Sequence, residues 1–504
     1  MSQGKVWLVG AGPGEPGLIT VRGLEVLSQA DVVLYDALAH PSLLDACPGA
    51  DKRYVGKRYA FDNPPQAGIN RVLIEEAKQG KKVVRLKGGD PFLFARGAEE
   101  AEALADAGIP FEVVPGVPSP VAAAAYAGMS LTHRDLSSST TFITGSDKAG
   151  KEWSPDAWKK LATATDTICV LMGMRRIEDI TRAIIDGGRD PGTPAAVIQW
   201  GARPEQRVEV ATLGTIAQRV RDSGITNPAI IVVGQIVSLR DKLSWYDSRP
   251  LFGKRILVPR PAHQAVATAE AVRARSARPI AFPVIEIVDP PEPERLLAAA
   301  RDVQRYDWVL FTSANGVDRF FAALAQVGRD ARAFATAKIG VIGPKTGKAL
   351  DRFGLRPDLV AKEYVGEALA EAILGAGDVR RVLIPRALEA REDLPKLLEA
   401  SGAEVNVVPA YETRPVGKKQ AEELRDMIES GDVDVVMFTS GSTVSSTVEL
   451  LGDRAVELLG RITVASIGPI TTRAAEARGV TPAVTASEYT VDGLLDALEA
   501  QFRP

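Results

Sequence analysis

The pattern of apolar and polar residues in the first 116 residues alternates between short apolar runs and helical segments. Runs at 6–9, 31–35, 53–55, 81–86 and 111–114 predict strands, because each is short and bounded by glycines or polar residues. The intervening segments 21–29, 65–79 and 98–107 carry apolar residues at helical spacing. This alternation of strand and helix is typical of a parallel α/β domain.

The alternation resumes after three prolines, Pro115, Pro118 and Pro120. We therefore place a domain boundary there and divide the first half into residues 1–116 and 117–245. The second of these contains predicted strands at 140–144, 167–172, 195–199 and 229–233 and predicted helices near 156–162, 176–186 and 215–222. The polar segment 246–253, which includes Pro250, suits a short linker.

The second half of the chain repeats itself. RILVPRP at 255–261 returns as RVLIPRA at 381–387, FTSANGV at 311–317 as FTSGSTV at 438–444, and IGP at 342–344 recurs at 467–469. A repeat of this kind predicts a duplicated α/β domain. Each copy has strands that end in turns of small residues before a helix, and such turns offer backbone N–H groups and hydroxyls to a carboxylate.

Composition narrows the class of protein. The 504 residues are 45% hydrophobic and 25% charged with a net charge of −3, which is ordinary for a globular chain and gives no sign of a nucleic-acid partner. No run of 18 or more apolar residues and no signal peptide is present, so we expect a cytoplasmic protein without a membrane span. Two cysteines and three histidines lie far apart, so we expect neither disulfides nor a metal site.

Glycine-rich turns at the ends of the predicted strands are the candidate binding sites in the first half. GAGPG at 10–14 and KGGDP at 87–91 follow two strands, and Asp36 and Lys57 follow two others. The carboxyl ends of parallel strands meet at one edge, where ligands bind in open α/β sheets. A dinucleotide fingerprint is disfavoured, because Glu15 replaces its third glycine and Pro13 lacks the backbone N–H.

Many strings of residues 4–246 resemble one family, the uroporphyrinogen-III C-methyltransferases. They are VGAGPG at 9–14, ADVVLYD at 30–36, VGK at 55–57, RLKGGDPF at 85–92, VVPGV at 113–117, AGMSLTHR at 127–134, MG at 172–173 and GQIVSLRDKLSW at 234–245. The resemblance implies the two-domain tetrapyrrole-methylase fold, S-adenosylmethionine as cofactor and a homodimer formed through this half.

The same resemblance implies the site residues. It assigns Asp36 as proton acceptor and Lys57 as proton donor. It assigns S-adenosylmethionine binding to Pro13, Gly88, Gly89, Asp90, Leu93, Pro118, Ser119, Met172 and Gly201. Because the substrate carries eight carboxylates, the cationic side chains of Arg85, Lys87, Arg96, His133 and Arg134 are expected to hold its rim. Pro118 and Leu171 depart from the family, which usually has threonine and tyrosine there.

Residues 254–500 resemble uroporphyrinogen-III synthase in FPVIEI at 282–287, YDWVLFTSANGV at 306–317, AYETRP at 410–415, DVVMFTSGSTV at 434–444 and SIGPITTRAA at 466–475. The resemblance implies two parallel α/β lobes with an interchanged first segment. Lobe 1 is expected at about 254–283 plus 414–504 and lobe 2 at about 288–408. It implies Tyr411 as catalytic donor to the leaving group, Ser313, Ser440 and Thr471 as substrate-binding residues, and no cofactor.

Together these resemblances predict a bifunctional enzyme of tetrapyrrole biosynthesis. The second half would cyclise hydroxymethylbilane to uroporphyrinogen III with inversion of ring D, and the first half would methylate that product at C2 and C7 to precorrin-2, toward siroheme or cobalamin. Two alternatives stay open: methylation of a different corrin intermediate, and a first half that serves as a binding or scaffold module for an active synthase.

Overall fold

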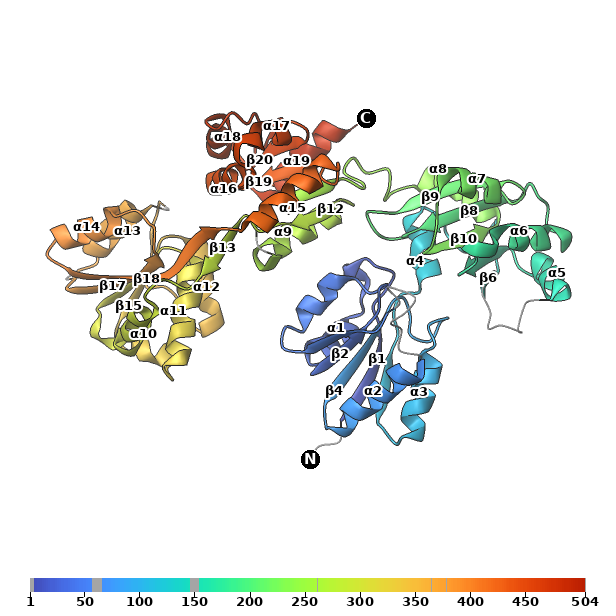
Figure 1. Ribbon diagram of the computed structural model, residues 1–504, viewed down its shortest axis with the longest axis horizontal. Coiled ribbons are helices and arrows are strands. Elements are labelled where there is room, and N and C mark those ends of the chain that lie inside the picture. The colour runs from blue at the N-terminus through green and yellow to red at the C-terminus, as the bar shows by residue number, and fades with distance from the viewer. Residues whose placement is uncertain are drawn as a thin grey trace. The chain divides into compact units, whose positions relative to one another are not determined.

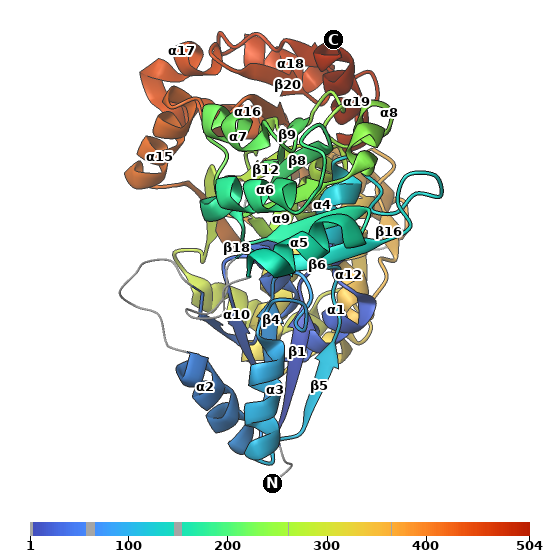
Figure 2. The same ribbon diagram turned by 90° about the vertical axis from the view of Figure 1, so that its right-hand side faces the viewer.

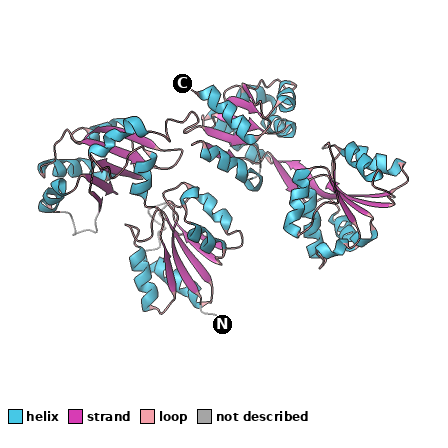
Figure 3. Ribbon diagram, turned by 180° about the vertical axis from the view of Figure 1, so that it is seen from behind, coloured by secondary structure: helices cyan, strands magenta, loops and turns pink. Residues whose placement is uncertain are grey.

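The computed structural model describes residues 4–56, 66–145, 154–260, 262–363, 365–377 and 379–503. Its contacts divide the chain into two compact units, 1–256 with 268–280 and 491–504, and 257–267 with 281–490. Four sheets flanked by helices form the fold (Figure 3). The predicted α/β class with largely parallel sheets is thereby confirmed, whereas the predicted domain boundaries and the duplicated lobes stay predictions.

The first sheet is parallel, with strand order β3-β2-β4-β1-β5. Its strands are β1 (Lys5–Gly10), β2 (Val32–Tyr35), β3 (Asp51–Tyr54), β4 (Lys82–Lys87) and β5 (Phe111–Val114), and its helices are α1 (Val21–Ser28), α2 (Gln66–Lys78) and α3 (Gly97–Asp106). Alternate residues of β1 face opposite sides. Val6 and Leu8 pack against α2 and α3, and Val9 packs on the side of α1. Helices α2 and α3 lie on one face of the sheet and α1 on the other (Figures 1 and 2).

The second sheet is mixed, with order β6-β7-β10-β8-β9. Its strands are β6 (Thr140–Thr144), β7 (Thr167–Leu171), β8 (Pro194–Gln199), β9 (Arg207–Thr212) and β10 (Ala229–Val233), with α4 (Ser119–Tyr126) on one face and α5 (Pro155–Ala164), α6 (Ile177–Asp186) and α7 (Ile216–Ser223) on the other. The antiparallel edge strand β9 was not predicted, because its half-exposed, charged sequence lacks an apolar run.

The segment 246–253 is packed rather than extended into solvent. Tyr246 and Leu251 are buried, and the ring of Tyr246 contacts those of Tyr126 and Phe252. The short helix α8 (Arg240–Leu243) precedes it, and Arg240 of that helix binds Asp247. Its designation as a linker stays a prediction.

The third sheet has order β12-β11-β19-β20-β21 and the fourth β13-β18-β17-β14-β15-β16. The third contains β11 (Arg255–Val258), β12 (Arg278–Ala281), β19 (Val435–Phe438), β20 (Thr463–Ser466) and β21 (Val484–Thr485), with helices α9 (Ala262–Ala274), α15 (Lys418–Glu429), α16 (Gly441–Leu451), α17 (Ala455–Leu459), α18 (Pro469–Glu476) and α19 (Val491–Phe502). Strands distant in the sequence are therefore neighbours in this sheet.

The fourth sheet is parallel except for β13, which pairs antiparallel with β18. Its strands are β13 (Ile285–Val288), β14 (Trp308–Phe311), β15 (Lys338–Val341), β16 (Leu359–Val360), β17 (Arg381–Ala387) and β18 (Glu404–Pro415). Helices α10 (Pro293–Arg301) and α11 (Ala314–Gln326) share one apolar cluster with the sheet, and α13 (Gly366–Leu374) and α14 (Asp393–Ala400) share another; α12 (Pro344–Leu350) follows β15.

Candidate functional sites

The loops that follow β1, β4 and β5 pack backbone against backbone. Ala11 donates to the carbonyl of Lys87 at 2.7 Å, and Gly12 and Gly89 exchange two backbone hydrogen bonds. A Cβ atom at Gly10 would lie 2.7 Å from the carbonyl oxygen of Gly89 and 2.6 Å from the Cα of Gly116. Only glycine permits this approach, so the glycine turns predicted from the sequence form one shared cradle at the strand ends.

Asp90 holds this cradle together. Its Oδ1 accepts hydrogen bonds from the backbone N–H groups of Phe92 and Leu93, and its Oδ2 accepts one from Gly116 at 3.0 Å. The carboxylate therefore links the loop after β4 to the loop after β5. Gly89 adopts a φ of +70°, and a Cβ there would meet nothing nearer than the backbone nitrogen of Ser119 at 3.6 Å. Gly89, Pro118 and Ser119 thus lie close together, and their role in cofactor binding stays a prediction.

Asp36 lies at the same strand edge and is partly exposed. Its Oδ1 accepts a hydrogen bond from the N–H of Leu38 at 3.1 Å, and its Oδ2 lies 3.3 Å from Nη2 of Arg85. The side chain is therefore held by a turn on one oxygen and by a cation on the other. Lys57, its predicted partner, lies outside the described residues.

Arg85 and Lys87 are buried, and both bind Glu100 of α3. Oε1 of Glu100 accepts from Nε of Arg85 at 3.3 Å, from Nζ of Lys87 at 3.0 Å and from Gln66 at 3.1 Å. Burial lowers the pKa of Lys87, and the charge of Arg85 adds to that effect while Glu100 opposes it. Arg85 therefore contacts Asp36 directly, and Lys87 shares the carboxylate of Glu100 with Arg85. The predicted contact of both cations with substrate stays a prediction.

The other predicted rim cations are on the surface. Arg96 is exposed and pairs with Glu99, with Nη2 at 2.6 Å from Oε2. Arg134 is exposed, and Nδ1 of the partly exposed His133 accepts from the backbone of Asp135 at 3.1 Å. Among the described residues, Arg96 is the one of these three cations with an ion-pair partner. No described ion pair holds His133 or Arg134 away from an anionic ligand.

Three non-glycine residues with positive φ lie at or beside predicted cofactor positions. Met172 has φ 55°, and Trp200 and Ala202, which flank Gly201, have φ 50° and 64°. Such conformations cost about 1–3 kcal/mol each and concentrate at functional sites. Gly201 also has a packing reason, because a Cβ there would lie 2.3 Å from Cβ of Ala123. The strained backbone at Met172, Trp200 and Ala202 is therefore compatible with a ligand-binding role, and at Gly201 close packing is a sufficient reason for the glycine.

Arg203 is a further side chain at this edge that the sequence did not indicate. Its Nη2 donates to the carbonyl of Leu38 at 2.8 Å, and its Nε would be 2.0 Å from a Cβ at Gly14. Burial lowers its pKa. Arg203 therefore contacts both the turn after Asp36 and the turn after β1. The sequence contains no local motif for this role, because the partners of Arg203 lie far from it in the chain.

In the fourth sheet the predicted residues Ser313 and Tyr411 meet. Oγ of Ser313 lies 3.0 Å from the hydroxyl of Tyr411 and also accepts from the N–H of Gly316, so it caps α11. Tyr411 is only 7% exposed and belongs to the apolar cluster under α10 and α11. The structure thus brings together a buried phenol and a capping serine from residues 98 apart in sequence.

Ser440 and Thr471 lie at the starts of two helices that follow strands of the third sheet, and Ser440 corresponds to Ser313 in the repeat. Ser440 caps α16 by accepting from Thr443, and Thr471 is buried in the first turn of α18, which packs on α16. Close to them Ser466, Thr472 and Thr485 form a hydroxyl cluster, with Thr472 and Thr485 at 2.8 Å. No described hydrogen bond joins Ser440 or Thr471 to Tyr411, so a common substrate site for all four stays a prediction.

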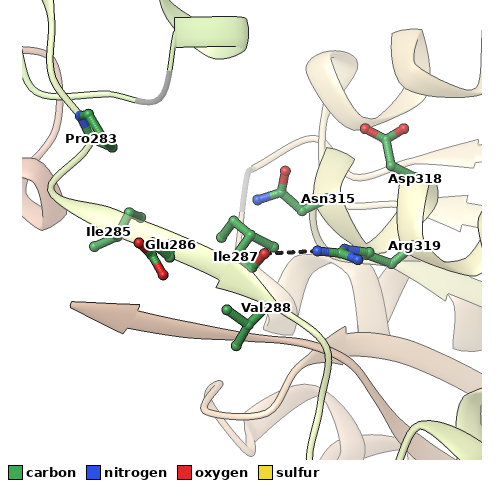
Figure 4. A pocket seen from close by; sticks show the side chains of 8 residues that line it. All are labelled: Pro283, Ile285, Glu286, Ile287, Val288, Asn315, Asp318 and Arg319. Carbon is green, nitrogen blue, oxygen red and sulfur yellow. Dashed lines mark hydrogen bonds between the residues drawn. The ribbon is translucent and has the colours of Figure 1, made fainter. Parts of the chain in front are cut away.

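A cavity of about 470 Å³ lies between β13 and the first turns of α11 (Figure 4). Nη2 of Arg319 donates to the carbonyl of Ile287 at 2.8 Å and Nη1 contacts Asp289 at 2.7 Å. Arg319 therefore ties α11 to β13 and is already satisfied on both terminal nitrogens.

Within the described ranges no group of three or more His, Cys, Asp or Glu side chains is arranged to hold a metal ion. Cys47 and Cys169 are both buried and free. In the same ranges, no helix has the length and apolar character that crossing a membrane requires.

Comparison with known proteins identifies both halves. The family model for tetrapyrrole (corrin/porphyrin) methylases matches residues 5–217, and that for uroporphyrinogen-III synthase HemD matches residues 266–496. The porphyrin biosynthesis protein HemD of Ruminiclostridium josui is 41% identical over 500 residues, which are 99% of this chain and 98% of that protein.

Two further relatives match the first half. The uroporphyrinogen-III C-methyltransferase of Bacillus subtilis (strain 168) is 47% identical over 49% of this chain and 95% of its own length. A crystal structure of the Thermus thermophilus uroporphyrin-III C-methyl transferase with S-adenyl homocysteine shares 36% identity over 47% of this chain and 99% of that one, at a TM-score of 0.41. The two family models and the 41% identity over 99% of the chain show that it belongs to both families at once, a tetrapyrrole methylase joined to a uroporphyrinogen-III synthase, and is a bifunctional enzyme of tetrapyrrole biosynthesis.

Proposed function

We propose that the chain carries out two consecutive reactions. The second half cyclises hydroxymethylbilane to uroporphyrinogen III with inversion of ring D, and the first half transfers methyl groups from S-adenosylmethionine to C2 and C7 of that product, giving precorrin-2. The observation that carries the proposal is the union of the two families in one chain, which makes the product of one half the substrate of the other.

The residues of the first half fit S-adenosylmethionine. The open Cβ position of Gly89 and its positive φ leave backbone room for a ligand beside Pro118 and Ser119. The predicted set would hold it: Pro13, Gly88, Gly89, Asp90, Leu93, Pro118, Ser119, Met172 and Gly201. When bound, it supplies an electrophilic methyl group to a pyrrole carbon.

Asp36 is the residue of this chain best placed to take the proton that the methylated ring must lose. It is partly exposed at the strand edge, and Arg85 fixes one of its oxygens at 3.3 Å. A general base must lie within hydrogen-bond reach of the proton that it takes, and the contact with Arg85 fixes the position of this carboxylate. The proposal assigns Lys57 as the donor, on the resemblance alone.

In the second half Tyr411 is assigned as the donor to the departing hydroxyl of hydroxymethylbilane. The hydroxyl leaves as water and so takes up one proton, which the phenol held by Ser313 at 3.0 Å is placed to transfer. The pyrrole carbon that forms the ring-closing bond loses one proton, which restores the balance. Ser313, Ser440 and Thr471 lie in first turns or caps of helices, where backbone N–H groups favour carboxylates. The proposed reaction uses side chains and backbone alone and no cofactor.

Incubation of the full chain with hydroxymethylbilane, with and without S-adenosylmethionine, tests the proposal. We expect uroporphyrinogen III alone without the cofactor and a dimethylated product with it, identified by mass and isomer. Type I isomer in both reactions would contradict the synthase assignment. Type III isomer that stays unmethylated in the presence of S-adenosylmethionine would contradict the methyltransferase assignment and favour the scaffold alternative. The 47% identity of the first half to a uroporphyrinogen-III C-methyltransferase speaks against that alternative.

Two further parts of the proposal concern assembly and place. We propose a homodimer formed through the methyltransferase half and a cytoplasmic location. Light scattering of the purified chain tests the first, with a mass of twice 53.7 kDa expected and a single-chain mass contradicting it. Fractionation of the native cells tests the second.

A further inference from the structure

Glu100 is a fully buried carboxylate in the first turn of α3, and neither the predicted catalytic residues nor the predicted binding residues include it. Its Oε1 accepts hydrogen bonds from Nε of Arg85, Nζ of Lys87 and Nε2 of Gln66, at distances between 3.0 and 3.3 Å. Its Oε2 is also buried and has no hydrogen-bond partner among the described residues. Glu100 therefore offers one oxygen to three donors.

Glu76 of α2 is a second buried carboxylate of the same domain, and it binds two cations in a different way. Its Oε1 accepts from Nη1 of Arg53 and its Oε2 from Nζ of Lys81, so each oxygen has a cation of its own. That arrangement satisfies both oxygens of a buried carboxylate, whereas the arrangement of Glu100 satisfies one. A buried oxygen without a partner calls for an explanation, and the other contacts of Arg85 provide one.

Arg85 connects Glu100 to Asp36. Its Nε donates to Oε1 of Glu100 and its Nη2 to Oδ2 of Asp36, both at 3.3 Å. Its Nη1 donates to the carbonyls of Leu34 and Leu86, so all three nitrogens of the planar guanidinium are bonded. The side chain of Arg85 is 5% exposed and that of Asp36 is 23% exposed. Because the fork is rigid, Glu100 fixes the place at which Arg85 meets Asp36.

The same contacts balance the charge around Asp36. With all four groups ionised, the carboxylates of Asp36 and Glu100 match the cations of Arg85 and Lys87. An adjacent cation favours the ionised form of a carboxylate, so Arg85 by itself makes Asp36 accept a proton less readily. Glu100 offsets this effect, because its own charge lies against the same guanidinium. Without that charge, Asp36 would be the one carboxylate of the group, next to two buried cations.

We propose that Glu100 is a positioning residue of the methyltransferase half, which acts through Arg85 to hold Asp36 in place and to keep it able to accept a proton. The inference rests on the proposed function, in which Asp36 takes that proton. In this reaction a ring carbon bonds to the methyl carbon while the bond from sulfur to that carbon breaks. The ring system thereby gains one positive charge, which it loses as one proton to Asp36.

The test measures methylation of uroporphyrinogen III by the full chain in Glu100→Gln, in Asp36→Asn and in the double variant. Glutamine keeps the shape and one acceptor oxygen of Glu100 but not its charge. A small displacement of a reacting group can cost about 10²-fold, so we expect Glu100→Gln to lower kcat about 10- to 100-fold. The KM for either substrate should change less than about threefold, since neither touches Glu100. In the Asp36→Asn background the same substitution should change kcat less than about threefold, because the two residues act as a unit.

Glu76→Gln is the matched control. It also takes a buried carboxylate from two cations of the first domain, and no described hydrogen bond joins Glu76 to Asp36 or Arg85. We expect its kcat to stay near the wild-type value. Calorimetry of S-adenosylmethionine binding reports on the fold of each variant. Glu100→Asp keeps the charge and should recover part of the turnover that Glu100→Gln loses.

A structural role of Glu100 predicts different results. An equal fall of kcat in Glu76→Gln, a wild-type kcat in Glu100→Gln or loss of S-adenosylmethionine binding in that variant would each overturn the inference. So would a double variant in which the two losses multiply, or a Glu100→Asp chain no faster than Glu100→Gln. Wild-type turnover in Asp36→Asn, by contrast, refutes the role of Asp36 in the proposed function itself.

Discussion

The two candidate sites at strand ends differ in the charge of their side chains. At the first sheet the edge is charged: Asp36 pairs with the buried Arg85, and Glu100 pairs with both Arg85 and the buried Lys87. At the fourth sheet the edge carries a neutral pair, Ser313 and Tyr411, beside helix starts.

The difference follows from the energetic cost of burying charge. Each ion taken out of water needs a partner, and Glu100 provides one carboxylate to two cations at once. Neutral hydroxyls need only one hydrogen bond each, so the second site can form without a buried network. We therefore expect substitutions that remove a charge to have the larger effects at the first site. Substitutions that remove a hydrogen bond at the second site should have smaller effects.

The largest effect should come from Asp36→Asn. A general base contributes about 10²–10⁴-fold to a rate, and asparagine keeps the turn hydrogen bond but cannot accept the proton. Methylation turnover should fall by that factor while S-adenosylmethionine binding, measured by calorimetry, is retained. Asp45→Asn, an exposed aspartate of the same domain, is the control. Wild-type turnover in Asp36→Asn would make the residue structural.

Next in size is Glu100→Leu. It leaves Arg85 and Lys87 buried without their carboxylate, and breaking a buried pair costs about 3–5 kcal/mol. Hydrogen exchange of the β4 peptide should speed up accordingly. Glu99→Gln, which removes the exposed pair with Arg96, should cost less than about 1 kcal/mol. Equal protection in both variants would show that the network does not stabilise the first site.

Pro118→Thr should strengthen cofactor binding. Pro118 is the residue that caps α4 without a side-chain hydrogen bond, and it lacks a backbone N–H. Threonine restores a hydroxyl and an N–H, which together correspond to about a three- to hundred-fold lower Kd for S-adenosylmethionine. Calorimetry on both proteins measures it. Weaker binding in the variant would mean that the fixed φ of proline contributes more than the missing donors.

Ser313→Ala tests the neutral site. It removes the cap of α11 and the bond to Tyr411, so α11 should lose about 0.5–2 kcal/mol of protection in hydrogen exchange. Ser440→Ala removes the cap of α16 without a tyrosine partner and is the matched control. A loss no larger than that of Ser440→Ala would show that the tyrosine bond adds nothing to stability.

The smallest effect concerns pH. Hydrogen bonds from Lys5, Arg22 and Trp7 lower the pKa of Glu112 from 4.5 to about 2. A carboxylate whose pKa is lower in the folded than in the unfolded state stabilises the fold above its unfolded pKa. This stabilisation is lost as the pH falls through the folded pKa. The stability difference between wild type and Glu112→Gln, below about 1 kcal/mol at neutral pH, should vanish between pH 4.5 and 2 in urea unfolding. A difference that persists at pH 2 would exclude the ionised carboxylate as its source.

In residues 1–245 the sequence by itself determined most strands and helices, because short apolar runs and helical spacing are local properties. It also located the glycine turns at 10–14 and 87–91, since close backbone approach requires glycine wherever it occurs. The run at 81–86 predicted the strand β4, but not that its Arg85 would be buried.

Only the tertiary structure decided what each polar side chain contacts. Glu100 reaches Arg85 from a helix after the strand, and Ser313 meets Tyr411 across 98 residues. Partners of this kind depend on how strands are ordered within a sheet, and that order follows from packing between distant segments, which a local pattern does not contain.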